Sequence, residues 1–134
     1  MNKVCELLIE RGQDIRKAIG DYVLEQGWEA AYVSGAVGSV QDVCLTAPKC
    51  RELPPQVNRT EVEGPGEIIA FTGEVMVKDK MDPNLKSVYK DDGHPLFIHI
   101  HASLAVSGAH VYGGGLQEGK AFRLLKVYLQ QVSA

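Results

Sequence analysis

A chain of 134 residues with 45% hydrophobic content is long enough for one compact domain with its own core. The formal net charge of -3 excludes an overall basic surface for DNA, RNA or anionic membranes, so nucleic-acid binding would need a local basic patch. No apolar run could cross a membrane, and three cysteines without metal-ligand spacing indicate neither a disulfide framework nor a zinc ribbon. We therefore expect one domain over residues 1–134, in a cytoplasmic protein with reduced thiols and no membrane contact.

The first elements are a strand and a helix. An alternating apolar pattern predicts a strand over residues 3–10. Apolar residues at helical spacing follow, with Asp14 as the expected N-cap and Gly27 as the C-terminal stop. Gly20 lies inside this helix, where it lowers helix stability, and it therefore suggests close packing against a neighbouring element.

Short strands and turns are expected next. Residues 30–34 and 40–45 have strand character, and the small residues at 35–39 predict a turn between them. Residues 47–66 are rich in proline, glycine and charge, which predicts a loop with a short strand near residues 56–62.

A longer strand is expected over residues 67–78, with Ile69 and Phe71 on the same apolar face. Residues 80–94 are polar and rich in turn formers, so they predict a surface excursion. Such loops often border a binding site.

The next strand, residues 95–104, organises the chain. Its alternation divides the side chains between an apolar face with Ile98, Ile100, Ala102 and Leu104 and a second face with Phe97, His99, His101 and Ser103. A turn at residues 107–108, a short strand at 110–112 and a final strand at 121–132 are expected to follow. The chain is therefore predicted to be α+β, with a curved, mainly antiparallel sheet of about six or seven strands and one main amphipathic helix.

Two histidines on one strand face form the main candidate site. His99 and His101 would have Cβ atoms about 7 Å apart, a separation that one metal ion can bridge. A catalytic zinc site usually has three protein ligands, so one ligand is missing. The candidates for it are His110, His94, Glu67 and Glu74. The alternative is that the pair makes structural hydrogen bonds at a subunit interface.

Two glycine-containing motifs and one carboxylate are also candidates for functional sites. Residues 114–120 match G-x-x-x-x-G-K, but Ala121 stands where a phosphate-binding loop has Ser or Thr, and a strand is expected to follow. This segment and residues 35–38 instead predict tight turns and close backbone approach. Glu67 is the candidate acid or base if it lies buried near His99, and otherwise a structural carboxylate.

Five motifs together resemble one family. Residues 10–15 (ERGQDI), 32–40 (YVSGAVGSV), 67–73 (EIIAFTG), 99–104 (HIHASL) and 111–116 (VYGGGL) resemble, in order, the plants-and-prokaryotes-conserved (PPC) domain family. The resemblance covers nearly the whole chain. It implies an α+β fold with an antiparallel sheet, and a homotrimer as in other prokaryotic single-domain members. In plant relatives the domain follows a DNA-binding AT-hook and mediates assembly and protein contacts, so DNA or DNA-associated proteins are the implied partners. This sequence has no such hook.

The resemblance also bears on the histidine face. Some relatives bind zinc or another divalent metal through the H-x-H pair and a third histidine in the glycine segment. The matching positions here are His99, His101 and Gly115, so the third ligand is absent and His110 would have to replace it. Acetolactate decarboxylases have a similar sheet with three zinc-binding histidines, which implies a small-molecule lyase as one activity for the family. The ligand-pocket candidates are Thr72, Gly113, Gly114 and Gly115.

Two functions follow from these observations. The first is a trimeric binding or assembly module with a DNA-related role. The second is an enzyme or ligand-binding protein that uses the face of His99 and His101, between subunits, with Glu67 lining the site.

Overall fold

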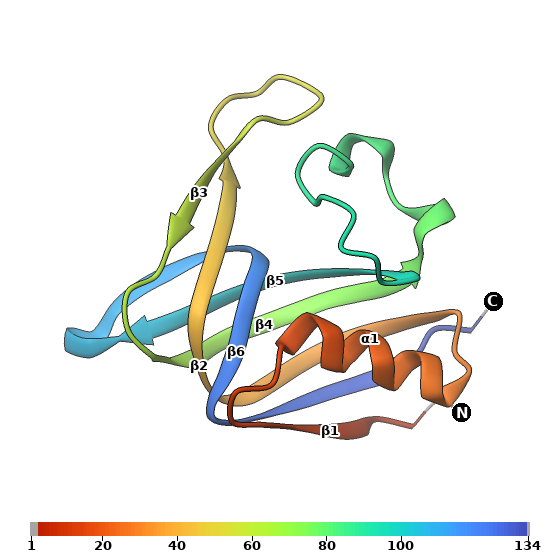
Figure 1. Ribbon diagram of the computed structural model, residues 1–134, viewed down its shortest axis with the longest axis horizontal. Coiled ribbons are helices and arrows are strands. Elements are labelled where there is room, and N and C mark those ends of the chain that lie inside the picture. Colours follow the sequence, from red (N-terminus) through yellow and green to blue (C-terminus); the bar gives the residue numbers. More distant parts are fainter. Residues whose placement is uncertain (1–2, 134) are drawn as a thin grey trace.

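The computed structural model describes residues 3–133, which form one α-helix and six strands (Figure 1). In chain order the elements are β1 (Cys5–Glu10), α1 (Ile15–Gln26), β2 (Ala30–Pro48), β3 (Val57–Glu61), β4 (Gly66–Val77), β5 (Leu96–Val106) and β6 (His110–Gln131). The strands pair antiparallel throughout, so the predicted α+β class with a curved antiparallel sheet is confirmed. No helix within residues 3–133 is long and apolar enough to span a membrane.

The sheet closes on itself. Its strand order is β1-β6-β5-β4-β2-β3, and β2 also pairs with β6, so that β2, β4, β5 and β6 form a ring. Because β2 and β6 are long and bend, each can pair with several neighbours along its length. The ring encloses the main core, while β1 and β3 extend it at either side.

Two predicted breaks are wrong, because glycines bend the strands without ending them. The expected turn at residues 35–39 lies within β2, where register shifts between Val33 and Gly35 and between Gly38 and Val40 mark bulges. The expected gap between residues 112 and 121 lies within β6. Close backbone approach at both places is confirmed: a Cβ at Gly38 would collide with the Leu124 carbonyl, and one at Gly114 would lie 2.5 Å from the Thr46 carbonyl oxygen.

Ile69 is a third correction. The pairing of β4 with β5 shifts register between Ile68 and Ala70, so a bulge turns Ile69 outward while Phe71 stays buried. The two side chains therefore do not share a face. A bulge of one residue is enough to invert the alternation on which the prediction depended.

The predicted helix is confirmed together with both of its ends. The Asp14 carboxylate accepts a hydrogen bond from the Lys17 backbone N–H at 2.9 Å, and Gly27 ends the helix with a positive φ of 73°. Figure 1 shows α1 lying across one face of the sheet. Its buried side chains pack onto the inner face of β5, where Ile98 and Ile100 are fully buried.

A second, smaller core lies on the opposite face of β5. The excursion between β4 and β5 folds back over this face, and its Val88 and Tyr89 pack against Phe97 of β5. Tyr89 and Phe97 meet edge to face, with ring centres 5.3 Å apart. The excursion therefore covers this strand face at Phe97 and reaches His99, while His101 stays exposed.

Candidate functional site

Strand pairing decides what surrounds the histidines. His101 pairs with Thr72 of β4 on one side and with Gly115 of β6 on the other, and His99 pairs with Glu74 of β4. Two of the predicted pocket residues, Thr72 and Gly115, thus flank His101 directly. The other two also belong to β6: Gly114 lies opposite Ala102 and borders a cavity together with both histidines, whereas Gly113 lies opposite Ser103.

The two imidazoles lie close together within an aromatic cluster. The ring centres of His99 and His101 are 5.0 Å apart and the rings are nearly perpendicular. The His99 ring stacks on Phe97 at 5.3 Å and meets the edge of Tyr89 at 5.5 Å. These contacts fix the orientation of His99, whereas His101 is more exposed.

His99 is held in its neutral form. Burial lowers its pKa from the ordinary value of 6.5, and the adjacent His101 lowers it further. The Glu74 carboxylate opposes this shift, with Oε1 3.5 Å from His99 Nδ1. A neutral imidazole whose Nδ1 faces a carboxylate leaves Nε2 free to act as a ligand or acceptor.

Two cavities open at the histidine pair. The larger, of about 410 Å³, lies between β2, β6 and the excursion and is bordered by Thr46, Tyr89 and Gly115 as well as both histidines. The smaller, of about 280 Å³, lies on the side of β4 and is bordered by Tyr32, Thr72 and Glu74 with the same histidines. The larger cavity is within the range of small-molecule sites.

The remaining candidate ligands lie elsewhere. His110 pairs with Val106 at the hairpin end, five residues along β5 from His101, or about 17 Å. Glu67 is exposed opposite Ala105 and is not near the histidines. Within residues 3–133 no three His, Cys, Asp or Glu side chains gather as a metal site, so metal binding by His99 and His101 stays a prediction.

A half-buried arginine holds the excursion in place beside the site. Arg16 of α1 donates from Nη2 to the Ile98 carbonyl at 3.0 Å, and its Nη1 lies 3.5 Å from Asp92 Oδ2. Its guanidinium carbon also lies 5.5 Å from the centre of the Tyr89 ring. Arg16 therefore connects helix, strand and excursion behind the tyrosine.

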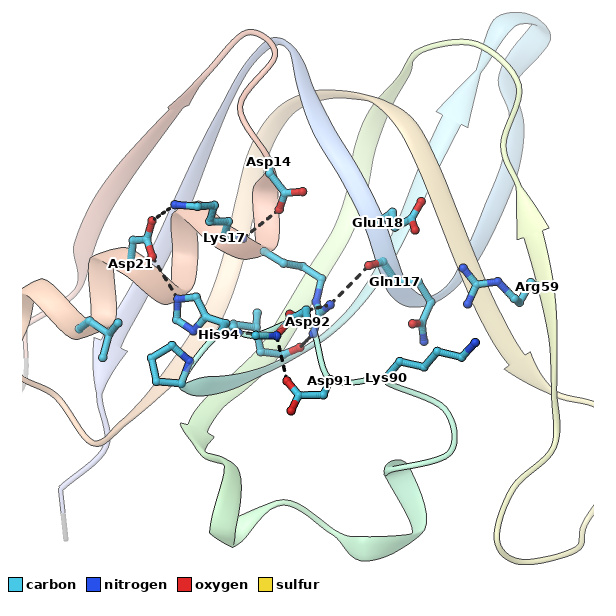
Figure 2. A pocket seen from close by; sticks show the side chains of 15 residues that line it. Asp14, Lys17, Asp21, Arg59, Lys90, Asp91, Asp92, His94, Gln117 and Glu118 are labelled. Atoms are coloured by element: carbon cyan, nitrogen blue, oxygen red, sulfur yellow. Dashed lines mark hydrogen bonds and ion pairs between the residues drawn. The ribbon is translucent and has the colours of Figure 1, made fainter.

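A histidine clasp forms a second attachment, visible in Figure 2. His94 Nδ1 accepts a hydrogen bond from the Leu96 N–H at 3.0 Å, so the ring proton is on Nε2, which lies 3.1 Å from Asp21 Oδ1. The hydrogen bond from Lys17 lowers the pKa of Asp21 below its ordinary value, and His94 contributes in the same direction. The ring rests on Gly20, whose missing side chain leaves room for it. His94 is thereby engaged in holding the excursion, at a distance from the other histidines.

Tyr89 and Arg16 were not identified from the sequence. Tyr89 occurs in a polar segment without regular alternation, and Arg16 occupies an ordinary position in an amphipathic helix. Neither has a motif, and only the folding of the excursion onto β5 brings Tyr89 to the histidines.

Comparisons with known proteins agree with the fold and the motifs. Residues 2–133 match the model of the Plants and Prokaryotes Conserved (PCC, or PPC) domain. The chain belongs to this family. A comparison with curated proteins found no match for this PPC domain.

Solved structures share the fold of this PPC domain. A PPC protein of Pyrococcus horikoshii is 21% identical, with a TM-score of 0.78 and coverage of 98% of this chain and 80% of its own. A metal-containing protein of Archaeoglobus fulgidus is 26% identical, with a TM-score of 0.75 and coverage of 98% and 81%. A protein of Bacteroides thetaiotaomicron, provisionally described as DNA-binding, is 14% identical, with a TM-score of 0.71 and coverage of 98% and 80%.

Proposed function

We propose that this PPC domain is an assembly module that forms a homotrimer through the outer face of β2 and β4. The observation that supports the proposal is a set of large apolar side chains exposed there. Tyr32, Val37 and Ile69 are 45%, 64% and 58% exposed. The pairs Val33 with Gly73 and Ser39 with Glu67 bound this stretch of the two strands, and both Val37 and Ile69 lie between these pairs.

These side chains do not contribute to the core of one chain, because the core lies inside the closed ring, against the opposite faces of the strands. Burying one of them in a subunit interface would contribute about 1.5–3 kcal/mol. Tyr32 also borders the smaller histidine cavity, so a second subunit on this face would lie beside His99 and His101.

The test is the mass in solution, measured by light scattering after size exclusion at micromolar concentration. We expect three times the 14.6 kDa of one chain. Ile69→Asp should yield a folded monomer, because it would bury a charge in the interface. Val4→Asp, at an equally exposed residue near β1, should leave the trimer intact. A wild-type monomer, or equal effects of both variants, would contradict the proposal.

For a DNA-related role, we propose DNA-associated proteins as partners ahead of DNA itself. The provisional description of the Bacteroides protein supports a DNA-related role. The charge of the chain does not favour direct contact, since 17 acidic residues outnumber 14 basic ones. Lys78, for instance, is already paired with Asp91 at 2.7 Å.

The second candidate function is metal binding by His99 and His101, supported by their geometry. Two imidazoles on one tetrahedral ion have ring centres about 5 Å apart, given metal–nitrogen distances of about 2.0–2.1 Å. The measured separation is 5.0 Å. Glu74 at Nδ1 of His99 is the carboxylate partner that metal-bound histidines usually have. The metal-containing relative of Archaeoglobus fulgidus supports the same proposal.

A bound ion would supply Lewis acidity toward an oxygen of a small molecule in the larger cavity. The test is elemental analysis of protein purified without chelator or affinity tag. We expect bound zinc, iron or manganese, which the double variant His99→Ala/His101→Ala should lose. Wild-type protein that contains no metal and whose melting temperature does not rise on zinc addition would overturn this candidate.

A further inference from the structure

The hydroxyl of Tyr89 is an unused polar group in the larger cavity. The residue is only 6% exposed, yet its hydroxyl makes no hydrogen bond to any group in residues 3–133. Within residues 3–133 the one fully buried side-chain nitrogen or oxygen without a partner is Arg16 Nε, so the Tyr89 oxygen is accessible from the cavity and can contact a bound group there.

The hydroxyl lies where a side chain at position 115 would begin. A Cβ built on Gly115 would be 2.5 Å from Tyr89 Oη and 3.1 Å from Thr46 Oγ1. Gly115 faces His101 across the β5–β6 pair. The Tyr89 oxygen therefore occupies the place beside His101 that is otherwise open to a residue of β6.

The same hydroxyl belongs to the aromatic cluster around the histidines. The Tyr89 ring meets His99 edge to face, with ring centres 5.5 Å apart. Tyr89, His99 and His101 all border the larger cavity. Arg16, which lies against the Tyr89 ring, and the contact of His94 with Asp21 both hold the excursion in place. Tyr89 is therefore positioned by residues that do not line the cavity. Two imidazoles and a phenol oxygen are thus presented to one space.

We propose that Tyr89 is the third protein donor of the metal site at His99 and His101. The proposal rests on the metal-binding candidate above, and it adds a phenol oxygen as the ligand. Three donors of this kind, two nitrogens and one hard oxygen, fit zinc and ferric iron, and leave a coordination position open toward the cavity. The phenol proton is released to solvent when the oxygen binds the ion.

The experiment measures Co²⁺ affinity by absorbance titration of the wild-type protein, Tyr89→Phe, and the control Tyr112→Phe. Tyr112 is an exposed tyrosine of β6 outside the cavity. We expect Tyr89→Phe to weaken Co²⁺ binding by at least about tenfold, which is the smallest loss usually seen when a residue that merely supports the metal ligands is removed. The control variant should bind Co²⁺ like wild type. With Fe(III) added as its citrate complex, we also expect a visible phenolate-to-iron charge-transfer band, which Tyr89→Phe should lose. Phenylalanine keeps the ring contacts, and circular dichroism would verify the fold.

A second variant tests whether Tyr89 and position 115 share one place. Gly115 does not have a positive φ, so its backbone accepts a side chain once the hydroxyl is removed. We expect Tyr89→Phe/Gly115→His to regain Co²⁺ binding without the iron charge-transfer band. If this double variant does not regain Co²⁺ binding, the claim that the Tyr89 hydroxyl and a side chain at position 115 occupy the same position is wrong.

The outcomes separate the two levels of the proposal. Wild-type protein that binds Co²⁺ no better than His99→Ala/His101→Ala would overturn both the metal site and the role of Tyr89. Tyr89→Phe that binds Co²⁺ as well as wild type, with the band unchanged, would overturn the role of Tyr89 and leave the two-histidine site standing.

Discussion

The contact between Gly20 and His94 allows a quantitative test of how the excursion is held. In an exposed helix, Gly→Ala stabilises by about 1 kcal/mol because glycine loses more backbone entropy on folding. At Gly20 the new Cβ would lie 2.6 Å from Cε1 and 2.7 Å from Nε2 of His94. The imidazole cannot easily yield, because hydrogen bonds to Leu96 and Asp21 hold both of its nitrogens.

Overpacking of this kind costs about 1–3 kcal/mol. After the helix gain is subtracted, we expect Gly20→Ala to lower the free energy of unfolding by about 1 kcal/mol, or about 3–5 °C in Tm for a chain of this length. In a His94→Ala background the collision with the ring is absent and only the contact with Ile98 Cδ1 at 3.0 Å remains, so the same substitution should raise stability by up to about 1 kcal/mol. The coupling between the two sites is therefore about 2 kcal/mol.

The assay is urea unfolding of the four proteins of this cycle at one fixed protein concentration, since subunit association would otherwise change the apparent stability. The sign change between the two backgrounds is the decisive result. If Gly20→Ala is stabilising by the same amount in both, then the His94 ring does not rest on the helix and the clasp is misassigned.

Further predictions concern acid, thiols and DNA. Folding lowers the pKa of Asp21, so the ionised carboxylate stabilises the protein above the ordinary pKa of 3.8, and this contribution is lost as the pH falls through the lower pKa of the folded state. In acid unfolding, Asp21→Asn should reduce the dependence of stability on pH in this range. Cys50 is exposed and Cys44 is buried with its pKa raised by burial, so Cys50 should react rapidly with a thiol reagent and Cys44 only on unfolding; fast labelling in a Cys50→Ser protein at Cys44 would contradict the burial. DNA association, measured by fluorescence anisotropy, should be weak and disappear with added salt; tight binding in high salt would mean that the charge distribution has been misread.

The sequence by itself determined the class of fold and the inner face of the histidine strand. Alternation in residues 95–104 was sufficient because both faces of β5 are defined by covering layers, and the caps Asp14 and Gly27 bounded the helix through local hydrogen bonding. The five motifs also identified the family, which the match over residues 2–133 confirmed. These features depend on neighbours in sequence, so local patterns could predict them.

Tertiary structure alone decided where strands bend and what meets the histidines. Gly38 and Gly114 resemble turn residues, but pairing with distant strands keeps their segments extended. The bulge at Ile69 likewise depends on the register with β5. Tyr89 reaches the place beside His101 only because the excursion packs onto β5 and β6. Long-range packing creates these contacts, and no local pattern encodes them.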